Sequence, residues 1–296
     1  MKIRFTKMQG CGNDYVYVDG GKEKVPQEKK SDLAIKVSDR HFGIGSDGLI
    51  FINPVDDPDI DFEMEMYNAD GSRSEMCGNG IRCVAKFVYD KLLTDKKNLT
   101  IVSAGKKKYI DLTVDENNKV SLVKVDMGAP ILRPGEVPAD TSSFNEEIVD
   151  PEKIVNKGLL VDGKEYKMTC VSMGNPHAVT FLSNKSELDN LEIEKVGPLF
   201  ENHKAFPRRT NTEFVYVADK KNVYMRVWER GTGETLACGT GCCATAVSCI
   251  LNGLTDNEVT IHVLGGEIKC SWDGDASSPV IMEGPATTVF DGEIEI

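Results

Sequence analysis

Alternating apolar and polar positions run through most of the chain and predict a fold rich in β-strands. The clearest alternation is at 62–67, where glutamates separate apolar side chains, whereas 49–52 is a short continuous apolar run. Two other segments, 26–37 and 191–200, have the spacing of helices with one apolar face. The predicted strands are 3–5, 15–18, 49–52, 62–67, 99–102, 109–114, 120–126, 166–171, 178–181, 213–217, 223–228, 259–263, 267–272, 280–283 and 287–296.

Two further predicted helices each follow a cysteine and a Gly-x-Gly sequence. After Cys238, a short apolar face leads to Gly253, where a glycine would end the helix. After Cys77, the apolar residues have the i, i+3, i+4, i+7 spacing of one helix face, at Ile81, Val84, Ala85 and Val88. We therefore expect each cysteine at a helix N-terminus, where unpaired N–H groups and the helix dipole stabilise a thiolate and attract an anion.

The two halves of the chain repeat these features at matching distances. Asn13 precedes Cys77 by 64 residues, and Asn175 precedes Cys238 by 63. Asn68 and Glu229 each stand nine residues before the cysteine of their half. Several matches in register predict duplicated structure, with the stretch from 127 to 151 as a linker or loop into the second domain. Two related domains would present the two cysteines to one ligand site.

Composition and charge narrow the classes of function. The chain has 296 residues, 40% of them hydrophobic and 28% charged, which is typical of a globular protein. The net charge of −12 argues against nucleic acid or a membrane surface as a partner. No apolar run is long enough to span a membrane. Nine cysteines, an odd number without a Cys-x-x-Cys pair, make a disulfide framework or zinc ribbon unlikely and favour the reducing cytoplasm.

Two thiols at helix N-termini point to proton transfer at carbon. One thiolate can remove a proton from a carbon while a thiol on the opposite face delivers another, which inverts a stereocentre without a cofactor. Backbone N–H groups would stabilise charge on the substrate's carboxylate. Arg230 could bind a second carboxylate, and His177 could tune a thiol. The glycine-rich stretch 43–48 precedes a strand, so it does not predict a dinucleotide site.

These motifs together resemble the diaminopimelate epimerase family over nearly the whole chain. The resemblance implies interconversion of LL- and meso-2,6-diaminopimelate for lysine and peptidoglycan synthesis, without pyridoxal phosphate or metal. It also implies an α/β (α+β) fold of two pseudo-symmetric domains, each a curled mixed sheet around a central helix. We expect these domains at 1–126 plus 285–296 and at 127–284. The matching segments are Gly12–Tyr15, Arg40–Gly45, Asn68–Ser72, Met76–Gly80, Gly174–His177, Asn211–Phe214 and Glu229–Gly241.

The resemblance also implies a role for each site residue. Cys77 and Cys238 would be the catalytic acid and base, with His177 and Glu229 modulating their pKa values. Asn13 would lie near the reacting centre. The reacting carboxylate would be bound by Gly78, Asn79, Gly239 and Thr240. The distal amino-acid end of the substrate would be held by Asn68, Asn175, Asn211, Glu229 and Arg230.

The chain departs from the family pattern at three positions, and other functions stay open. Some members have glutamine where this chain has Gly48, a histidine where it has Gln9, and an interface tyrosine where it has Phe290. A homodimer remains the expectation. Proline racemase and 4-hydroxyproline epimerase also use two thiols, but they would carry histidine in place of Asn79. A thiolate metal-binding or redox protein, or a cysteine hydrolase using Cys238 and His177, are alternatives from other classes.

Overall fold

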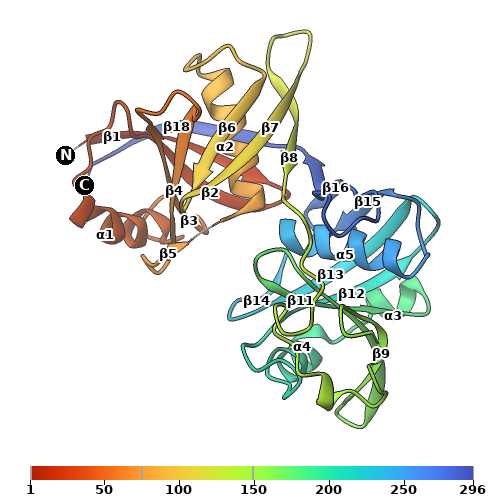
Figure 1. Ribbon diagram of the computed structural model, residues 1–296. Coiled ribbons are helices and arrows are strands. Elements are labelled where there is room, and N and C mark those ends of the chain that lie inside the picture. Colours follow the sequence, from red (N-terminus) through yellow and green to blue (C-terminus); the bar gives the residue numbers. More distant parts are fainter. Residues whose placement is uncertain (1, 75, 149, 296) are drawn as a thin grey trace. The chain divides into compact units, whose positions relative to one another are not determined.

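The chain folds into two units, each containing one of the cysteine-bearing helices (Figure 1). The computed structural model describes residues 2–74, 76–148 and 150–295. Unit 1 comprises Met1–Asp126 and Glu283–Ile296, and unit 2 comprises Met127–Met282. Unit 1 is thus built from two segments far apart in the sequence, whereas unit 2 is one continuous stretch.

Unit 1 is a mixed sheet with two helices. Its strands are β1 (Lys2–Gly10), β2 (Asn13–Asp19), β3 (Gly48–Pro54), β4 (Phe62–Asn68), β5 (Arg73–Ser74), β6 (Asn98–Ser103), β7 (Lys106–Val114), β8 (Val120–Asp126) and β18 (Thr287–Glu295). Its helices are α1 (Gln27–Ser38) and α2 (Gly78–Asp90). Hydrogen-bonded neighbours follow the order β18–β1–β2–β3–β4–β6–β7–β8, and β5 pairs with the end of β4. The pairs β2–β3 and β4–β6 are parallel and the others antiparallel.

Unit 2 is built in the same way. Its strands are β9 (Ile154–Val161), β10 (Lys164–Ser172), β11 (Pro176–Phe181), β12 (Asn211–Val217), β13 (Asn222–Glu229), β14 (Gly233–Thr235), β15 (Glu258–Val263) and β16 (Gly266–Ser271). The strand β17 (Ile281–Gly284) crosses the boundary between the units and pairs with β8. Its helices are η1 (Thr141–Ser143), α3 (Lys185–Asp189), α4 (Ile193–Glu201) and α5 (Gly239–Leu251). Neighbours follow the order β9–β10–β11–β12–β13–β15–β16, with β14 on β13.

The two units repeat one topology. In unit 1 the strands β1 to β4 pair antiparallel, parallel and antiparallel in turn, and β10 to β13 do the same in unit 2. A short strand and the cysteine-bearing helix follow, and the next strand pairs in parallel with β4 or β13. The predicted α/β class is confirmed, and the duplication read from the sequence spacing is present in the strand order.

One helix lies at the centre of each sheet. Nearly every residue of α2 is buried, and the helix contacts β1 and β2 as well as β7 and β8. Because these strands come from opposite parts of the strand order, the sheet must curl around the helix. Helix α5 contacts β10, β11, β12, β15 and β16 in the same manner. Its fully buried Cys242, Cys243 and Cys249 are small residues that let the strands approach closely.

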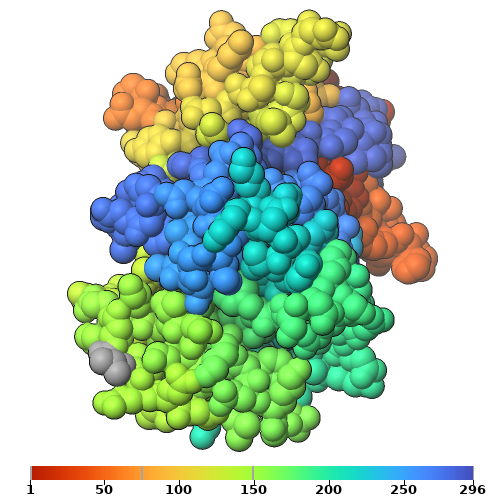
Figure 2. Space-filling view, turned by 90° about the vertical axis from the view of Figure 1, so that its right-hand side faces the viewer, coloured from red at the N-terminus to blue at the C-terminus, as the bar shows by residue number. Residues whose placement is uncertain are grey.

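The pattern-based elements are confirmed, with several omissions. The short elements β5, α3 and β14 carry too few residues for a periodic signal. β9 was missed because its alternation is broken at Asn156, whose φ of 54° marks an irregularity. The stretch from 127 is more than a linker, since Val137, Ala139 and Phe144 belong to the core of unit 2. Part of this stretch lies on the surface, where Figure 2 shows it in yellow-green. The final residue of the last predicted strand, 296, lies outside the described residues.

Candidate functional site

Cys77 is the N-cap residue of α2, as the sequence predicts. Its sulfur accepts a hydrogen bond from the Gly80 backbone N–H at 3.3 Å, so the thiol occupies the position usually taken by a capping hydroxyl or carboxylate. The thiol donates to the side-chain oxygen of Asn13, 3.1 Å away. Cys77 is half-buried. Because it caps the helix, its sulfur lies at the positive end of the α2 dipole.

Asn13 is placed by a tight hairpin and oriented by a carboxylate. Cys11 and Gly12 form the two-residue turn between β1 and β2, and both have positive φ angles, 52° and 83°, as this kind of hairpin requires. The Asn13 amide N–H donates to Asp47 at 2.7 Å. Asp47 in turn pairs with Arg40 at 2.9 Å. This arrangement leaves the amide oxygen of Asn13 facing the sulfur of Cys77.

Two other expected residues of unit 1, Asn79 and Asn68, and the nearby Gly48 have distinct surroundings. Asn79 is buried and donates to the Asn13 oxygen at 3.4 Å, so it belongs to the Cys77 cluster. Asn68 pairs with Gly48 across β3 and β4, and its amide donates to Ser72. A Cβ at Gly48 would lie 2.1 Å from the Tyr67 carbonyl oxygen, so this backbone admits no side chain there. The glutamine found in some members of the family that the sequence resembles therefore has no equivalent in this structure.

Cys238 is likewise the N-cap residue of α5, but its surroundings differ. It is only 6% exposed. Its sulfur lies 3.5 Å from the Thr240 hydroxyl. A Cβ at Gly241 would lie 3.3 Å from this sulfur and 2.7 Å from Glu213 Oε1, so glycine is needed where the helix passes over the cysteine. The helix-start prediction is confirmed for both cysteines.

A hydrogen-bonded chain of side chains leads from the core of unit 2 to Cys238. Glu213 Oε1 lies 2.6 Å from His177 Nδ1, and both side chains are fully buried. His177 Nε2 lies 3.1 Å from Asn175 Oδ1. The Asn175 amide N–H donates to the Thr240 hydroxyl at 3.3 Å. The strands β11 and β12 are parallel neighbours and present His177 and Glu213 on the same sheet face.

The remaining expected residues lie at the end of β13 and at the start of β12. Glu229 accepts a hydrogen bond from the Thr235 hydroxyl at 2.5 Å. Asn211 donates to the Pro176 carbonyl oxygen and accepts from the Arg230 backbone N–H, both at 2.9 Å. The Arg230 guanidinium is exposed and donates to a backbone carbonyl, that of residue 208. It has no carboxylate partner among the described residues and is available to an anionic ligand.

The electrostatic setting of Cys238 favours the neutral thiol. Burial, and next the charge of the nearby Glu229 carboxylate, raise the pKa of Cys238 well above that of a free cysteine. Burial also raises the pKa of Glu229, although hydrogen bonds from Thr235 and from the Cys238 thiol oppose this rise. The described contacts of the Cys77 sulfur are the Asn13 side-chain oxygen and the Gly80 backbone N–H.

Sequence reasoning missed two carboxyl groups that organise these clusters. Asp47 orients Asn13, and Glu213 contacts His177. Glu213 lies inside a motif that carries the family resemblance and Asp47 lies just after one, but the sequence pattern does not mark either as a site residue. The available signal for Glu213 was an acidic residue in an otherwise apolar strand core, Phe214 and Val215 following it directly. An acid in such a place is buried and needs a partner.

Other features of the described residues bear on the alternative functions. No group of three or more His, Cys, Asp or Glu side chains could hold a metal ion within the described ranges. All nine cysteines are thiols there, without a disulfide. None of the helices in the part of the chain that the structure describes is long and apolar enough to cross a membrane.

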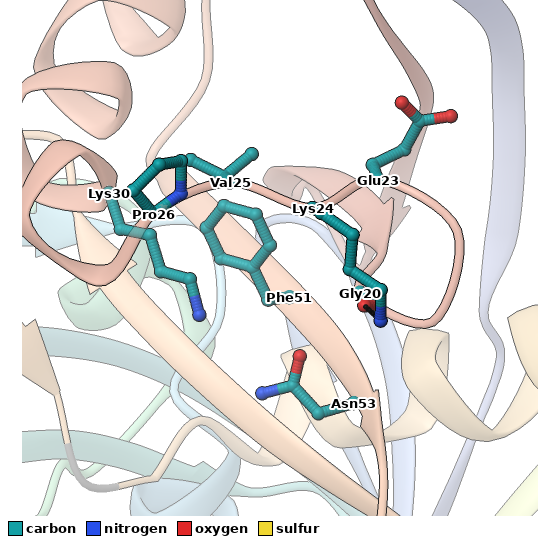
Figure 3. Close-up of a pocket in the computed structure, with 8 residues that line it drawn as sticks. All are labelled: Gly20, Glu23, Lys24, Val25, Pro26, Lys30, Phe51 and Asn53. Carbon is teal, nitrogen blue, oxygen red and sulfur yellow. Dashed lines mark hydrogen bonds between the residues drawn. The ribbon is translucent and has the colours of Figure 1, made fainter.

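A separate pocket of about 400 Å³ lies in unit 1 (Figure 3). Lys24 and Lys30 flank it, with the Phe51 ring and the Asn53 amide between them. The charge of Lys30 is compensated by buried Glu65, 2.5 Å away. The pocket contains none of the residues that the sequence predicts for the site.

Comparison with known proteins gives consistent matches. The family model described as "Diaminopimelate epimerase" matches residues 5–132 and 169–289. A curated diaminopimelate epimerase from Agathobacter rectalis is 53% identical over 297 residues, covering 99% of this chain and 100% of the relative. Another, from Methanococcus maripaludis, is 51% identical over 294 residues, covering 99% and 100%.

The architecture also occurs in solved structures of low sequence identity to this chain. A phenazine biosynthesis protein of the PhzF family from Bacillus anthracis superposes with a TM-score of 0.71 over 100% of both chains. Its sequence is 17% identical, so it bears on the fold alone.

Proposed function

The chain belongs to the diaminopimelate epimerase family, and from this premise we propose that it converts LL-2,6-diaminopimelate to meso-2,6-diaminopimelate. It is an isomerase, an amino-acid epimerase, and its product would serve lysine and peptidoglycan precursor synthesis. The observation that carries the proposal is the repeated arrangement of a cysteine at a helix N-cap followed by Gly-x-Gly. The reaction needs no pyridoxal phosphate and no metal in this proposal, because two thiols carry both proton transfers.

We assign the base to Cys77 and the acid to Cys238 in the LL-to-meso direction. The raised pKa of Cys238 keeps its proton in place, which leaves Cys77 as the base. The Cys77 sulfur lies at the positive end of α2 and accepts a hydrogen bond from the Gly80 backbone N–H, a setting that supports a thiolate. The α-carbon proton passes to the Cys77 sulfur as its bonding pair stays on carbon. The Cys238 thiol then gives its proton to the opposite face of that carbon. The thiol and thiolate have exchanged places at the end, and the reverse reaction uses them in exchanged roles.

The rest of the site binds the two ends of the substrate. The backbone at Gly78 and Gly239, with Asn79 and Thr240, would hold the reacting carboxylate at the two helix N-termini, where N–H groups stabilise the negative charge that develops. Asn13 would lie beside the reacting carbon. The distal amino-acid end would be held by Asn68, Asn175, Asn211, Glu229 and Arg230. His177 and Glu229 would adjust the acidity of Cys238.

Incubation with LL-diaminopimelate in deuterated water, without added cofactor, tests this proposal. We expect meso product that carries deuterium at one α-carbon. The variants Cys77→Ala and Cys238→Ala should each abolish turnover, because either loss removes one of the two proton carriers. Cys249→Ala, at the far end of α5, is the control and should retain activity. Near-normal inversion by either catalytic-cysteine variant would exclude the two-thiol assignment.

The alternative two-thiol enzymes act on proline or hydroxyproline. Asn79 stands where those enzymes would carry histidine, and the same exchange assay with L-proline separates the two substrate classes. Deuterium exchange into proline, without exchange into diaminopimelate, would favour the alternative. A metal-binding or redox protein would show neither exchange.

We propose that the two epimerase domains are 1–126 plus 285–296, with Cys77, and 127–284, with Cys238.

A homodimer is also part of the proposal. On β18, Val289 and Phe290 are about half exposed, and the Phe290 ring packs edge-on against Phe5. Exposed apolar residues on a strand are suited to pairing with a second copy. Light scattering of Phe290→Glu against the unmodified chain tests this. A cytoplasmic location would keep both catalytic thiols reduced.

A further inference from the structure

Glu213 is a buried carboxyl group that has no role in the proposed chemistry so far. It lies on β12 with its side chain fully buried. Its Oε1 contacts His177 Nδ1 at 2.6 Å, whereas its Oε2 has no hydrogen-bond partner among the described residues. A buried carboxyl with a single partner is costly to the fold. We therefore ask what the contact with His177 provides that an apolar residue at position 213 could not, namely a hydrogen bond to the ring.

The hydrogen bonds between Glu213 and Cys238 have a fixed direction. The Asn175 amide donates to the Thr240 hydroxyl, so its oxygen is left to accept. This oxygen faces His177 Nε2 at 3.1 Å, and Nε2 must therefore carry a hydrogen. In a neutral ring Nδ1 is then an acceptor, and the short contact to Glu213 requires the carboxyl group to be the donor. The neutral pair is favoured because both side chains are fully buried and Glu213 Oε2 has no donor among the described residues to stabilise a negative charge. Burial accordingly raises the pKa of Glu213.

We propose that Glu213 is a positioning residue that donates a hydrogen bond to His177 Nδ1 and thereby fixes the ring in its Nε2–H tautomer. Asn175 and the Thr240 hydroxyl are in consequence held toward the Cys238 sulfur. This inference rests on the proposed function, since it assigns Glu213 to the epimerase site. The chain of donors runs from the Glu213 carboxyl through His177 and Asn175 to the Thr240 hydroxyl, 3.5 Å from the sulfur.

Loss of this donor has a defined consequence. Without it, the buried Nδ1 lone pair has no donor, and the Nε2–H tautomer is held by the Asn175 oxygen alone. His177 can then also carry its hydrogen on Nδ1, which turns the Nε2 lone pair toward that oxygen. Two acceptors then face each other, and the amide must rotate to relieve the repulsion. Its N–H group would leave the Thr240 hydroxyl, which would no longer be held at the cysteine. The effect should therefore fall on turnover more than on substrate affinity.

The test compares Glu213→Gln and Glu213→Leu with the unmodified chain. A glutamine can donate to Nδ1 from its amide, and a leucine has similar bulk and no donor. With LL-diaminopimelate, we expect Glu213→Leu to lower kcat by roughly 10- to 100-fold, the range typical for the loss of a residue that orients a metal-ligating histidine, with a smaller change in KM. Glu213→Gln should restore most of the turnover. Equal loss in both variants, or none in Glu213→Leu, would overturn the proposal.

The ring nitrogens of His177 give a readout that does not depend on activity. In ¹⁵N-histidine spectra near pH 7, we expect one protonated Nε2 and one unprotonated Nδ1 in the unmodified chain and in Glu213→Gln. Glu213→Leu should show a mixture of tautomers. An imidazolium signal from His177 in the unmodified chain would overturn the proposal. Because the chain has only four histidines, and His177→Asn identifies the relevant signals, the assignment is direct.

The chain contains a matched control for this pair. His262 Nδ1 lies 3.1 Å from Glu267, and its Nε2 lies 3.0 Å from Asn222, so the same three residue types are present. The Glu267 side chain is 66% exposed and remote from the cysteines in sequence. Glu267→Leu should leave kcat and the His177 signals unchanged. If the unmodified chain shows no exchange with diaminopimelate, the proposed function fails while the tautomer measurement still decides the structural claim.

Discussion

Gly241→Ala tests whether the close approach of α5 to Cys238 is required. The added Cβ would lie 2.7 Å from Glu213 Oε1, 3.1 Å from Cys238 Cβ and 3.3 Å from its sulfur, whereas ordinary contact begins at 3.4 Å. Glu213 is fully buried and cannot swing into solvent, so the helix start or the carboxyl group must move. Overpacking of this kind costs about 1–3 kcal/mol, and the better helix propensity of alanine offsets up to about 1 kcal/mol.

We therefore expect a net destabilisation of about 1–2 kcal/mol, confined to unit 2. For a domain of this size, that loss lowers the unfolding temperature by roughly 2–8 °C. Turnover should fall as well, because the displaced group is the thiol or the carboxyl behind it. Differential scanning calorimetry gives the unfolding temperature, and deuterium exchange gives the turnover.

Two other glycines calibrate this measurement. At Gly80, the corresponding position in unit 1, a Cβ would meet first the flexible end of Ile50 at 3.0 Å, so Gly80→Ala should cost less. At Gly135 a Cβ would meet nothing within 4 Å, and Gly135→Ala should be neutral or slightly stabilising. If Gly241→Ala were as stable and active as Gly135→Ala, the packing described around Cys238 would be wrong.

Two further predictions concern titration. The Glu229 carboxylate helps to raise the pKa of Cys238, so Glu229→Gln should lower that pKa. Alkylation of Cys238 by iodoacetamide should then begin at a lower pH than in the unmodified chain. Peptide mass spectrometry measures the extent of alkylation. Burial raises the pKa of Glu65, but hydrogen bonds led by that from Lys30 outweigh it and lower the pKa to about 2. The ionised Glu65 therefore stabilises the fold above its unfolded pKa near 4.5, and this contribution is lost as the pH falls toward 2. Glu65→Gln should cost about 3 kcal/mol in urea unfolding at pH 7 and little at the acid end, and an equal cost at both would contradict the assignment.

Much of the fold could be predicted because the spacing of apolar residues within an element indicates whether it is a helix or a strand. Apolar spacing after Cys77 and Cys238 gave two helices with the cysteines as their N-caps, and the structure has both. The equal distances from Asn68 and Glu229 to these cysteines reflect a real repeat, since each residue ends a strand of matching topology, β4 or β13.

The parts that escaped prediction depend on contacts between distant residues. Nothing in the sequence near Asp47 says that its carboxylate orients Asn13, because the two are brought together only by the pairing of β2 with β3. The Glu213–His177 contact similarly requires the parallel pairing of β11 with β12. The strand β9 could not be predicted, because Asn156, with a positive φ, interrupts the alternation of apolar and polar side chains along it.

The pairing of β18 with β1 sets an order for folding during synthesis. Lys2 and Ile3 pair with Glu295 and Ile294, so the strand that completes the sheet of unit 1 leaves the ribosome after all of unit 2. Unit 2 can therefore finish its sheet while unit 1 still lacks one strand and leaves the outer edge of β1 uncovered. Removal of the last ten residues should consequently damage the half of the protein that was translated first.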